Sequence, residues 1–365
     1  MFVVLFVLTI ILVYAVFVVW AERKVAGFVQ DRLGPMETGP YGMLQTIADL
    51  LKLLQKEDII HSGADRFLFR LAPIVIFTAI FAGFATMPFS ASWIGSNAEV
   101  GVFFMITIIS LDVIGIFLLG WASNNKFSLL GAFRAIAQMI SYELPLTLSI
   151  LSVILIAGTL NLQEISYQQG IWFTNGQHLN TALFGITSWN IDVNAIGGFV
   201  SWNAFKYPFL LIAYGVFFIA SLAECNRAPF DIPEGESEIV AGFHTEYSGF
   251  RFAVLFLAEY AMMLLVALLG VVLFFGSWNT PFPNIGSMRL AEWTSGDPST
   301  FAGNCIGFFW LMSKAIVVVF LQIMMRWTYP RLRMDQLMNL CWKILLPVSM
   351  LVVIISGLWV VWMKA

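Results

Sequence analysis

Long apolar stretches alternate with shorter polar segments along the whole chain. A helix needs about 20 predominantly apolar residues to cross a bilayer, and eight stretches offer this with at most one charged residue each. The pattern predicts an all-α polytopic membrane protein, folded as a single membrane domain over residues 1–365. About eight transmembrane helices are expected, the fourth beginning near Arg134, within residues 1–21, 71–98, 100–125, 144–163, 207–223, 252–278, 301–325 and 344–363.

A second helical pattern lies within the first polar segment, residues 22–70. Between residues 43 and 56, apolar side chains recur every three or four positions, while Asp49 and Lys52 belong to the opposite, polar stripe. This segment is too short and too polar to span a membrane. We therefore expect an amphipathic helix that lies in the membrane interface or packs along the flank of the protein.

The composition agrees with a membrane location, and the distribution of positive charge predicts the orientation of the chain in the membrane. Only 11% of the residues are charged, against about a quarter in a typical soluble domain. Lys and Arg concentrate in cytoplasmic loops, and here they concentrate after the odd-numbered spans, so the loops at 22–70 and 224–251 are predicted to face the cytoplasm. Of the 19 Lys and Arg residues, the exceptions are Lys206, Arg289, Lys314 and Lys364.

Residues 164–203 form the long segment on the opposite side. They are rich in Asn, Gln, Thr, Gly and Trp, and only Glu164 and Asp192 are charged. We expect a far-side polar loop with short strands around residues 182–200, serving as a lid or as a contact surface for a neighbouring chain. Nothing in its composition indicates chemistry.

The loop at 224–251 holds the densest group of acids in the chain. Crowded, partly desolvated carboxyl groups cannot all ionise at their ordinary pKa, so some are expected to hold protons near neutral pH. This property is typical of a proton-coupled site. Acids after Pro233 would also favour a helix dipole, which accounts for one or two of them, and a divalent-cation site is the weaker alternative. The group, facing the single base Arg227, is Glu224, Asp231, Glu234, Glu236 and Glu238.

Charged residues lie inside four of the predicted spans: Asp112, Glu143, Glu259 and Lys314. A carboxylate in a membrane helix is a functional candidate by default, and Glu143, just before Pro145, is such a candidate. Asp112 is as compatible with a structural role as with a functional one. Lys314 is costly in a span unless paired, and we expect an acid of this chain or of a neighbour as its partner.

Several kinds of site have no pattern here. The three cysteines lie far apart, without the spacing of an iron–sulfur or zinc site, and no Gly-rich dinucleotide fingerprint is present. The chain is therefore expected to bind no FMN, no iron–sulfur cluster and no metal. It has no basic stripe that would favour nucleic acid.

Taken in order, short motifs across residues 21–346 resemble the H-subunit family of the proton-pumping NADH–quinone oxidoreductase, respiratory complex I. No single motif is specific, but their joint order is. One modest departure is Met36, which follows Gly-Pro where many members have Asn. The motifs include Ala21-Glu-Arg-Lys, Gln30-Asp-Arg-Leu-Gly-Pro, Ala48-Asp-Leu-Leu-Lys, Gly120-Trp-Ala-Ser-Asn, Arg134-Ala-Ile-Ala-Gln-Met-Ile-Ser-Tyr-Glu, Ala223-Glu-Cys-Asn-Arg-Ala-Pro-Phe-Asp, Pro233-Glu-Gly-Glu-Ser-Glu and Tyr329-Pro-Arg-Leu-Arg-Met-Asp-Gln-Leu-Met.

The resemblance implies three groups of site residues. Members of the family form the membrane half of a quinone tunnel, and the matching positions are Glu22, Arg23, Asp49, Lys52, Phe256 and Arg326. The acidic loop that couples quinone chemistry to proton movement matches Asp231, Glu234, Glu236 and Glu238. The path of acids leading away from the tunnel matches Glu143, Glu224, Glu246 and Glu259.

The resemblance also implies a setting. The chain is expected to be one component of a translocase, without catalysis alone, in the bacterial inner (plasma) membrane, with a quinone, ubiquinone or menaquinone, as substrate. Its expected partners are membrane lipid, the peripheral-arm quinone-site and iron–sulfur subunits, and the small membrane subunits leading to antiporter-like subunits. Two alternatives remain: the membrane anchor of a related membrane-bound hydrogenase, and a free-standing proton-coupled transporter, which often has internal repeats that this chain lacks.

Overall fold

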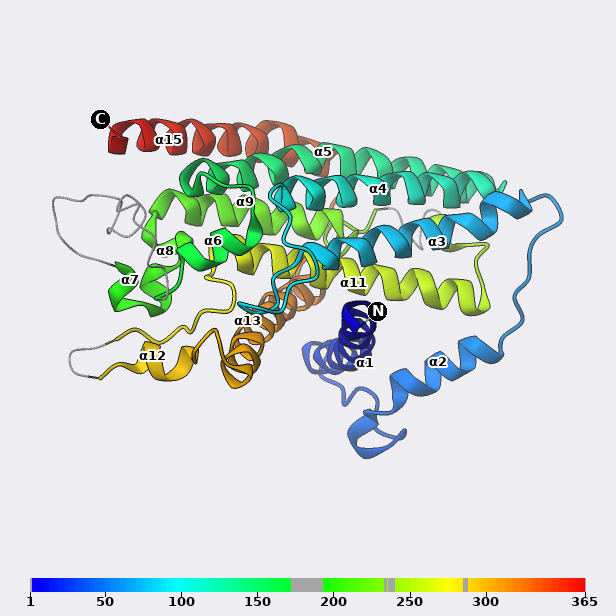
Figure 1. Ribbon diagram of the computed structural model, residues 1–365. Helices are drawn as coiled ribbons and strands as arrows, with labels where there is room; N and C mark the ends of the chain where they lie inside the picture. Colours follow the sequence, from blue (N-terminus) through cyan, green and yellow to red (C-terminus); the bar gives the residue numbers. More distant parts are fainter. Residues whose placement is uncertain (1, 172–192, 233–234, 236–239, 285–287, 365) are drawn as a thin grey trace.

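A computed structural model describes residues 2–171, 193–232, 235, 240–284 and 288–364 (Figure 1). Within these ranges the regular elements are helices, and an isolated bridge pairs Pro88 with Ile94. The helices are α1 (Phe2–Val29), η1 (Pro40–Gly42), α2 (Gln45–Gln55), α3 (Arg66–Gly83), η2 (Phe84–Thr86), α4 (Gly101–Ala122), α5 (Lys126–Ala157), α6 (Leu162–Gln168), α7 (Val193–Ile196), η6 (Gly198–Ser201), α8 (Asn203–Lys206), α9 (Pro208–Glu224), η7 (Gly242–His244), α11 (Gly249–Phe274), α12 (Leu290–Ser295), α13 (Phe301–Thr328), α14 (Met334–Leu340), η8 (Cys341–Leu345) and α15 (Leu346–Lys364).

Seven helical segments of the described chain are long and apolar enough to cross a membrane. They are α1, α3, α4, α5, α11, α13 and the continuous run of α14, η8 and α15. The eighth predicted span is α9, which has 17 residues, roughly 25 Å of helix at 1.5 Å per residue. The prediction of an all-α polytopic membrane protein is confirmed.

Two predicted boundaries were wrong. The third helix ends at Gly83, and the uncharged residues 84–98 mostly leave the helix. Chain reversal explains this, because Ser96 donates its amide hydrogen to the carbonyl of Ala85 at 2.8 Å, and a side chain at Gly95 would meet that same carbonyl at 2.5 Å. The fourth span begins at Lys126, earlier than Arg134, where the Asn125 side chain accepts the first amide hydrogen bond.

The strands predicted around residues 182–200 were also wrong wherever the structure describes that segment. Residues 193–196 form α7 and residues 198–201 form η6. Gly197 separates these two helical turns and Gly198 begins the second one, and both have positive φ. Such backbone interrupts an extended strand, and residues 172–192 lie outside the described part of the chain.

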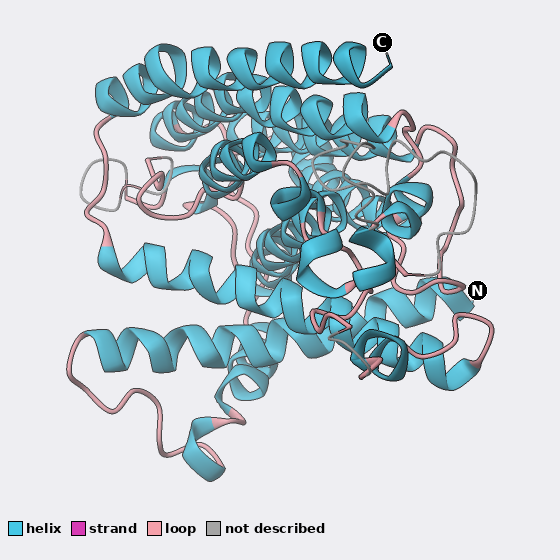
Figure 2. Ribbon diagram, turned by 90° about the vertical axis from the view of Figure 1, so that its left-hand side faces the viewer, coloured by secondary structure: helices cyan, strands magenta, loops and turns pink. Residues whose placement is uncertain are grey.

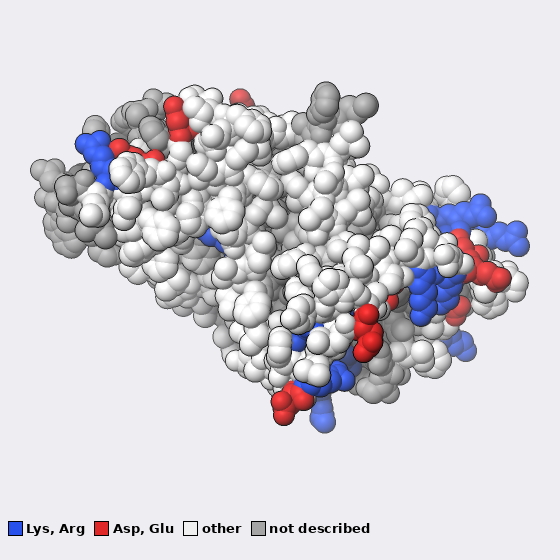
Figure 3. All heavy atoms as spheres, turned by 90° about the horizontal axis from the view of Figure 1, so that it is seen from below, with Lys and Arg blue, Asp and Glu red and all other residues white. Residues whose placement is uncertain are grey.

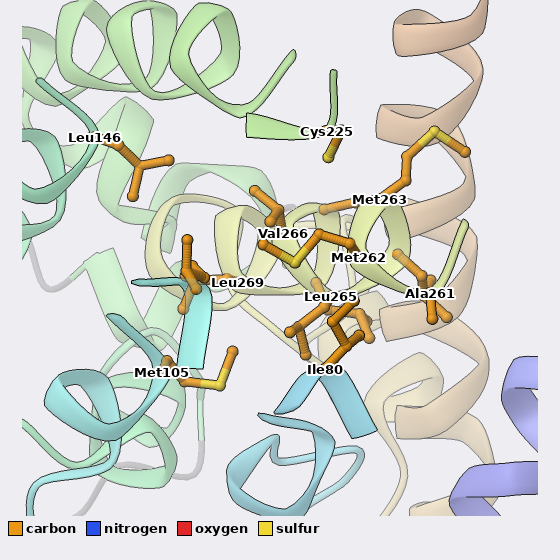
Figure 4. Packing of buried hydrophobic residues seen from close by; sticks show 14 of the residues in the cluster. Ile80, Met105, Leu146, Cys225, Ala261, Met262, Met263, Leu265, Val266 and Leu269 are labelled. Carbon is orange, nitrogen blue, oxygen red and sulfur yellow. The ribbon is translucent and has the colours of Figure 1, made fainter. Parts of the chain in front are cut away.

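Helix α11 is the centre of the fold. It packs against α3, α9, α13 and α2, and α5 packs against α4, α9 and α15 on one side of it (Figures 1 and 2). Every residue from Tyr260 to Phe274 is buried, as expected for a helix that is apolar all round. Figure 4 shows Met263 of α11 reaching toward α13 and Leu265 lying beside Ile80 of α3. Helices α2, α3, α9 and α13 are therefore held around α11.

Helices α1 and α2 lie at the edge of the bundle, and α1 runs in a different direction from the other long helices. Figure 1 views α1 nearly end-on, while α4, α5 and α15 run across the view, so α1 is steeply inclined to them. Helix α2 packs on α1 and α11 and has no buried residue, which confirms the predicted amphipathic helix at 43–56. On the face in Figure 3, most charged side chains gather toward α2 and the loops before and after it, and a smaller group lies at the opposite end.

Gly115 of α4 tests the close packing of α3 on α4. A Cβ atom at this position would lie 2.2 Å from Cγ1 of Ile76, whereas a Cβ at Gly215 of α9 would meet nothing within 4 Å. Gly115→Ala should therefore lower the free energy of unfolding by about 1–3 kcal/mol, because the added methyl group overpacks this contact. The unfolding temperature of the assembled protein should fall with it. Gly215→Ala is the matched control. Equal unfolding temperatures for the two variants would contradict this packing.

Candidate functional site

Glu22 joins three helices that are far apart in the sequence. Its side chain lies toward the C-terminal end of α1 and is 6% exposed. Arg326 of α13 forms an ion pair with one carboxylate oxygen, and the hydroxyl of Tyr260 on α11 donates a hydrogen bond to the other at 2.5 Å. A buried carboxylate needs such compensation, so Glu22 fixes α1, α11 and α13 at this point.

The next residue, Arg23, connects α1 to α2. Its guanidinium lies 2.5 Å from the carboxylate of Asp49, and Gln45 donates a hydrogen bond to the other Asp49 oxygen at 3.1 Å. The side chains of Arg23 and Asp49 are 42% and 35% exposed. Lys52 is also exposed, one turn further along α2.

Two adjoining cavities lie beside these ion pairs. The larger, of about 610 Å³, lies between α1, α11, α13 and the loop at 32–35. The smaller, of about 90 Å³, lies between α1, α2 and α11. They share Val19, Arg23, Phe256 and Tyr260. The combined space has charged groups where Glu22 and Arg326 lie and aliphatic walls toward Leu12 of α1.

A second group of charges lies on the other side of Tyr260. The Arg227 guanidinium is 4.4 Å from the centre of the Tyr260 ring and 3.8 Å from a Glu259 oxygen. His244 of η7 lies 3.3 Å from the other Glu259 oxygen. Tyr260 therefore contacts Glu22 through its hydroxyl and Arg227 through its ring, and it is the physical connection between the two charged groups.

Beyond Glu259 is a small cavity of about 30 Å³. Helix α9 ends there at Glu224, where Gln138 of α5 donates to the neighbouring carbonyl of Ala223 at 2.7 Å. Glu224 is 1% exposed, and neither of its carboxylate oxygens has a hydrogen-bond partner among the described residues. The other polar and ionisable residues in the wall are Asp112, Cys225, Asn226, His244 and Glu259.

Glu143 and Glu246 lie outside the walls of that cavity. Glu143 accepts a hydrogen bond from Ser110, which joins α5 to α4. Asn125 donates to Glu246 at 2.6 Å, which joins the segment after η7 to the start of α5. The four acids predicted as a path therefore do not form one cluster: Glu224 and Glu259 share a cavity, and the other two bind neighbouring helices.

The acidic loop is described at residues 224–232, 235 and 240–251, and Asp231 is the acid that lies just before the gap. Its carboxylate accepts a hydrogen bond from Arg331 at 2.8 Å, and Leu332 donates its amide hydrogen to the carbonyl of Pro229 at 3.0 Å. Burial raises the pKa of Asp231, and the Arg331 guanidinium opposes this shift. The loop is therefore held against the segment after α13. Glu234, Glu236 and Glu238 lie outside the described residues.

Comparison with known proteins gives the same assignment throughout. The NADH dehydrogenase family model matches residues 2–357. An H subunit of NADH-quinone oxidoreductase from Cytophaga hutchinsonii, numbered 2 in its name, is 81% identical over 364 residues, covering 100% of both chains. The H subunits of Chlorobium luteolum and Chlorobaculum parvum are 46% and 45% identical, covering 94% of this chain and 84% and 87% of theirs. This chain belongs to the H-subunit family of NADH-quinone oxidoreductase.

Of the six positions that the family resemblance assigned to a tunnel, five line the two cavities. Glu22, Arg23, Phe256 and Arg326 line the larger cavity, and Asp49 lines the smaller one. Lys52 lines neither. Sequence reasoning placed it beside Asp49 on the polar stripe of α2, and the structure keeps it on that helix with its side chain exposed.

We expected an acid as the partner of Lys314, and within the described part of this chain that prediction was wrong. Its ammonium group donates hydrogen bonds to the carbonyls of Phe275 and Asn279, at 2.8 and 2.9 Å, and lies 4.6 Å from the ring centre of Trp202. Carbonyl oxygens are available here because α11 ends at Phe274. Helix C-termini attract cations, so a carboxylate is unnecessary.

Sequence reasoning missed Tyr260 and His244 as site residues. Tyr260 adjoins Glu259 in a span, which could have marked it, since a buried tyrosine hydroxyl usually finds a partner. His244 gave no signal, because its contact with Glu259 depends on the turn of η7. Both contribute to the connection between the larger cavity and Glu224.

Replacing Glu22 with Gln tests the three-helix junction. The variant leaves Arg326 partly buried without its ionised partner, and breaking a buried pair costs about 3 kcal/mol. The unfolding temperature of this chain within the purified complex should fall accordingly. Glu292→Gln is the control, because it breaks an exposed pair with Arg289 that contributes at most about 1 kcal/mol. Equal effects would show that Glu22 does not hold these helices together.

Proposed function

We propose that this chain forms the membrane wall of the quinone site in a proton-translocating NADH–quinone oxidoreductase. It also couples quinone reduction to proton movement through its buried acids. The observation that carries this proposal is the pair of adjoining cavities, which runs from aliphatic side chains to the Glu22–Arg326 ion pair. The chain supplies one side of the enzyme, and the electrons come from partner subunits.

The size and lining of the cavities fit a lipid-soluble quinone. Small-molecule sites typically have volumes of about 300–1,000 Å³, with mostly apolar walls and a few polar groups, and the larger cavity, of about 610 Å³, falls within that range. The aliphatic end lies between α1 and α2, which offers a route from the bilayer for an isoprenoid tail. Phe256, shared by both cavities, presents a flat ring against which a quinone ring packs.

The polar end suits the head group. A quinone carries two carbonyl acceptors, and its reduction to quinol takes two electrons and two protons. Arg23 and Arg326 stabilise negative charge that develops on the ring oxygens, because a desolvated site strengthens such interactions. Glu22 already accepts a hydrogen bond from the Tyr260 hydroxyl. Proton demand at the ring therefore acts directly on the Glu22–Tyr260 hydrogen bond.

The coupling route follows the contacts of Tyr260. A change in the charge of Glu22 alters the position and field of Tyr260, and Tyr260 lies against Arg227, which pairs with Glu259. Glu259 borders the small cavity that holds Glu224. Interacting carboxyl groups titrate as a set, so a proton gained at one end shifts proton occupancy at the other. Asp231, bound by Arg331, lies beside the same connection.

The proposed setting is the bacterial inner (plasma) membrane, with the acidic loop on the cytoplasmic side. The half-exposed Arg23–Asp49 pair and the exposed Lys52 suit a lid supplied by the peripheral-arm subunits that carry the last iron–sulfur cluster. Glu143 and Glu246 continue the proposed route away from the site, toward the small membrane subunits that lead to the antiporter-like chains.

Glu224→Gln in the intact complex tests the coupling role. The amide keeps the shape of the side chain but cannot carry a proton, so proton pumping driven by NADH should fall several-fold while assembly is retained. Electron transfer from NADH to a soluble acceptor that bypasses quinone should stay unchanged. Glu164→Gln is the matched control, since its carboxylate binds Thr159 on the far side. A Glu224→Gln complex that pumps normally would refute the route.

Arg331→Gln tests the electrostatics of the acidic loop. Arg331 holds down a pKa that burial raises, so its removal raises the pKa of Asp231 further. Asp231 then takes up a proton at higher pH, and the acidic limb of the quinone-reduction profile should move toward higher pH. Arg289→Gln, far from the site, is the control. A profile that stays in place or moves to lower pH would show that the charge of Asp231 is not required.

A further inference from the structure

Asp112 carries the one carboxyl group in the described wall of the small cavity that the coupling route above does not use. It lies in the middle of α4 and is 7% exposed. Its Oδ1 atom has no hydrogen-bond partner among the described residues. An ionised carboxylate in this position would be strongly penalised, so the side chain either holds a proton or shares one with a neighbour.

Three carboxyl groups face the same small cavity from three different helices: Asp112 from α4, Glu224 from α9 and Glu259 from α11. Asp112 interacts electrostatically with both of the others. The volume of about 30 Å³ accommodates roughly two water molecules, since one needs about 10–15 Å³. The free oxygens of Asp112 and Glu224 supply the polar partners that such water requires.

The rest of the wall is mostly apolar. Other groups that can titrate or donate a hydrogen bond there are His244, which contacts Glu259, and Cys225 and Asn226, which follow Glu224. Glu143 acts on Glu224 from α5. The apolar side chains of the wall are Ile76, Ile80, Ile116, Leu119, Phe243, Leu255 and Met262.

Lys314 shows what a satisfied charge inside a span looks like in this fold. It donates hydrogen bonds to two carbonyl groups and lies over a Trp ring. Asp112 has no comparable set of donors at Oδ1. A purely structural carboxylate would be expected to have them, and this contrast favours a group whose hydrogen bonds change during turnover.

We propose that Asp112 is a proton-binding station between Glu259 and Glu224, an inference that rests on the function proposed above. The carboxyl group of Glu259 gives up a proton, which binds the carboxylate of Asp112. It then passes through water in the cavity to Glu224, so that at each step one O–H bond breaks and one forms. No electron moves in this part of the route.

The test is made in the intact membrane complex with Asp112→Asn, which keeps size and polarity but cannot release a proton at physiological pH. Assembly and electron transfer to a soluble acceptor should match the wild type, while proton pumping falls several-fold. Asp112→Glu should recover more than half of the lost pumping, with a shifted pH profile. Ile109→Val, a buried change in α4 outside the cavity, should pump normally.

Glu224→Gln measured in parallel separates this inference from the function on which it rests. If Glu224→Gln is impaired and Asp112→Asn pumps normally, Asp112 is not a station, although the route stands. If both pump normally, the route itself fails. If Asp112→Asn does not accumulate, the Glu variant decides: a shifted pH profile for pumping supports the proposal, and an unchanged profile overturns it.

Discussion

The site depends on one buried carboxylate that is compensated from two sides. Glu22 lies in the wall between α1, α11 and α13, and it remains there because Arg326 and Tyr260 satisfy its two oxygens. Partners of a buried charge cannot be removed without a large penalty, so this junction also sets the spacing of the three helices. The larger cavity exists because α1 is held at a steep angle while its end stays bound to α11 and α13.

Tyr260 connects this junction to a second group of charged residues. Its hydroxyl contacts Glu22 and its ring contacts Arg227, so a change in charge on the cavity side reaches Glu259 by direct contact. From there the protein interior is mostly apolar, and the few carboxyl groups that face the small cavity interact electrostatically. In the proposed function, this contact joins the quinone end of the chain to the acids that exchange protons, and α11 supplies both Tyr260 and Glu259.

Much of this could be predicted from the sequence. The apolar periods gave the spans, the polar stripe of residues 43–56 gave α2, and the rarity of charge in the spans marked Glu259 and Asp112. The remainder depends on contacts between distant segments. Glu22 and Arg326 are 304 residues apart, and no local pattern pairs them. Lys314 was assigned an acid because the sequence does not show the carbonyls left free where α11 ends, and the reversal at residues 84–98 depends on a hydrogen bond to Ala85 that composition does not reveal.

The most direct measurement is photo-crosslinking of the assembled complex with a photoreactive quinone, followed by peptide mapping. If quinone occupies the two adjoining cavities, labels should fall within residues 19–35 of α1 and its following loop and within residues 253–260 of α11. Excess unmodified quinone should remove them. Labels confined to helices outside these cavities, such as α15, or labels that unmodified quinone does not displace, would contradict the account.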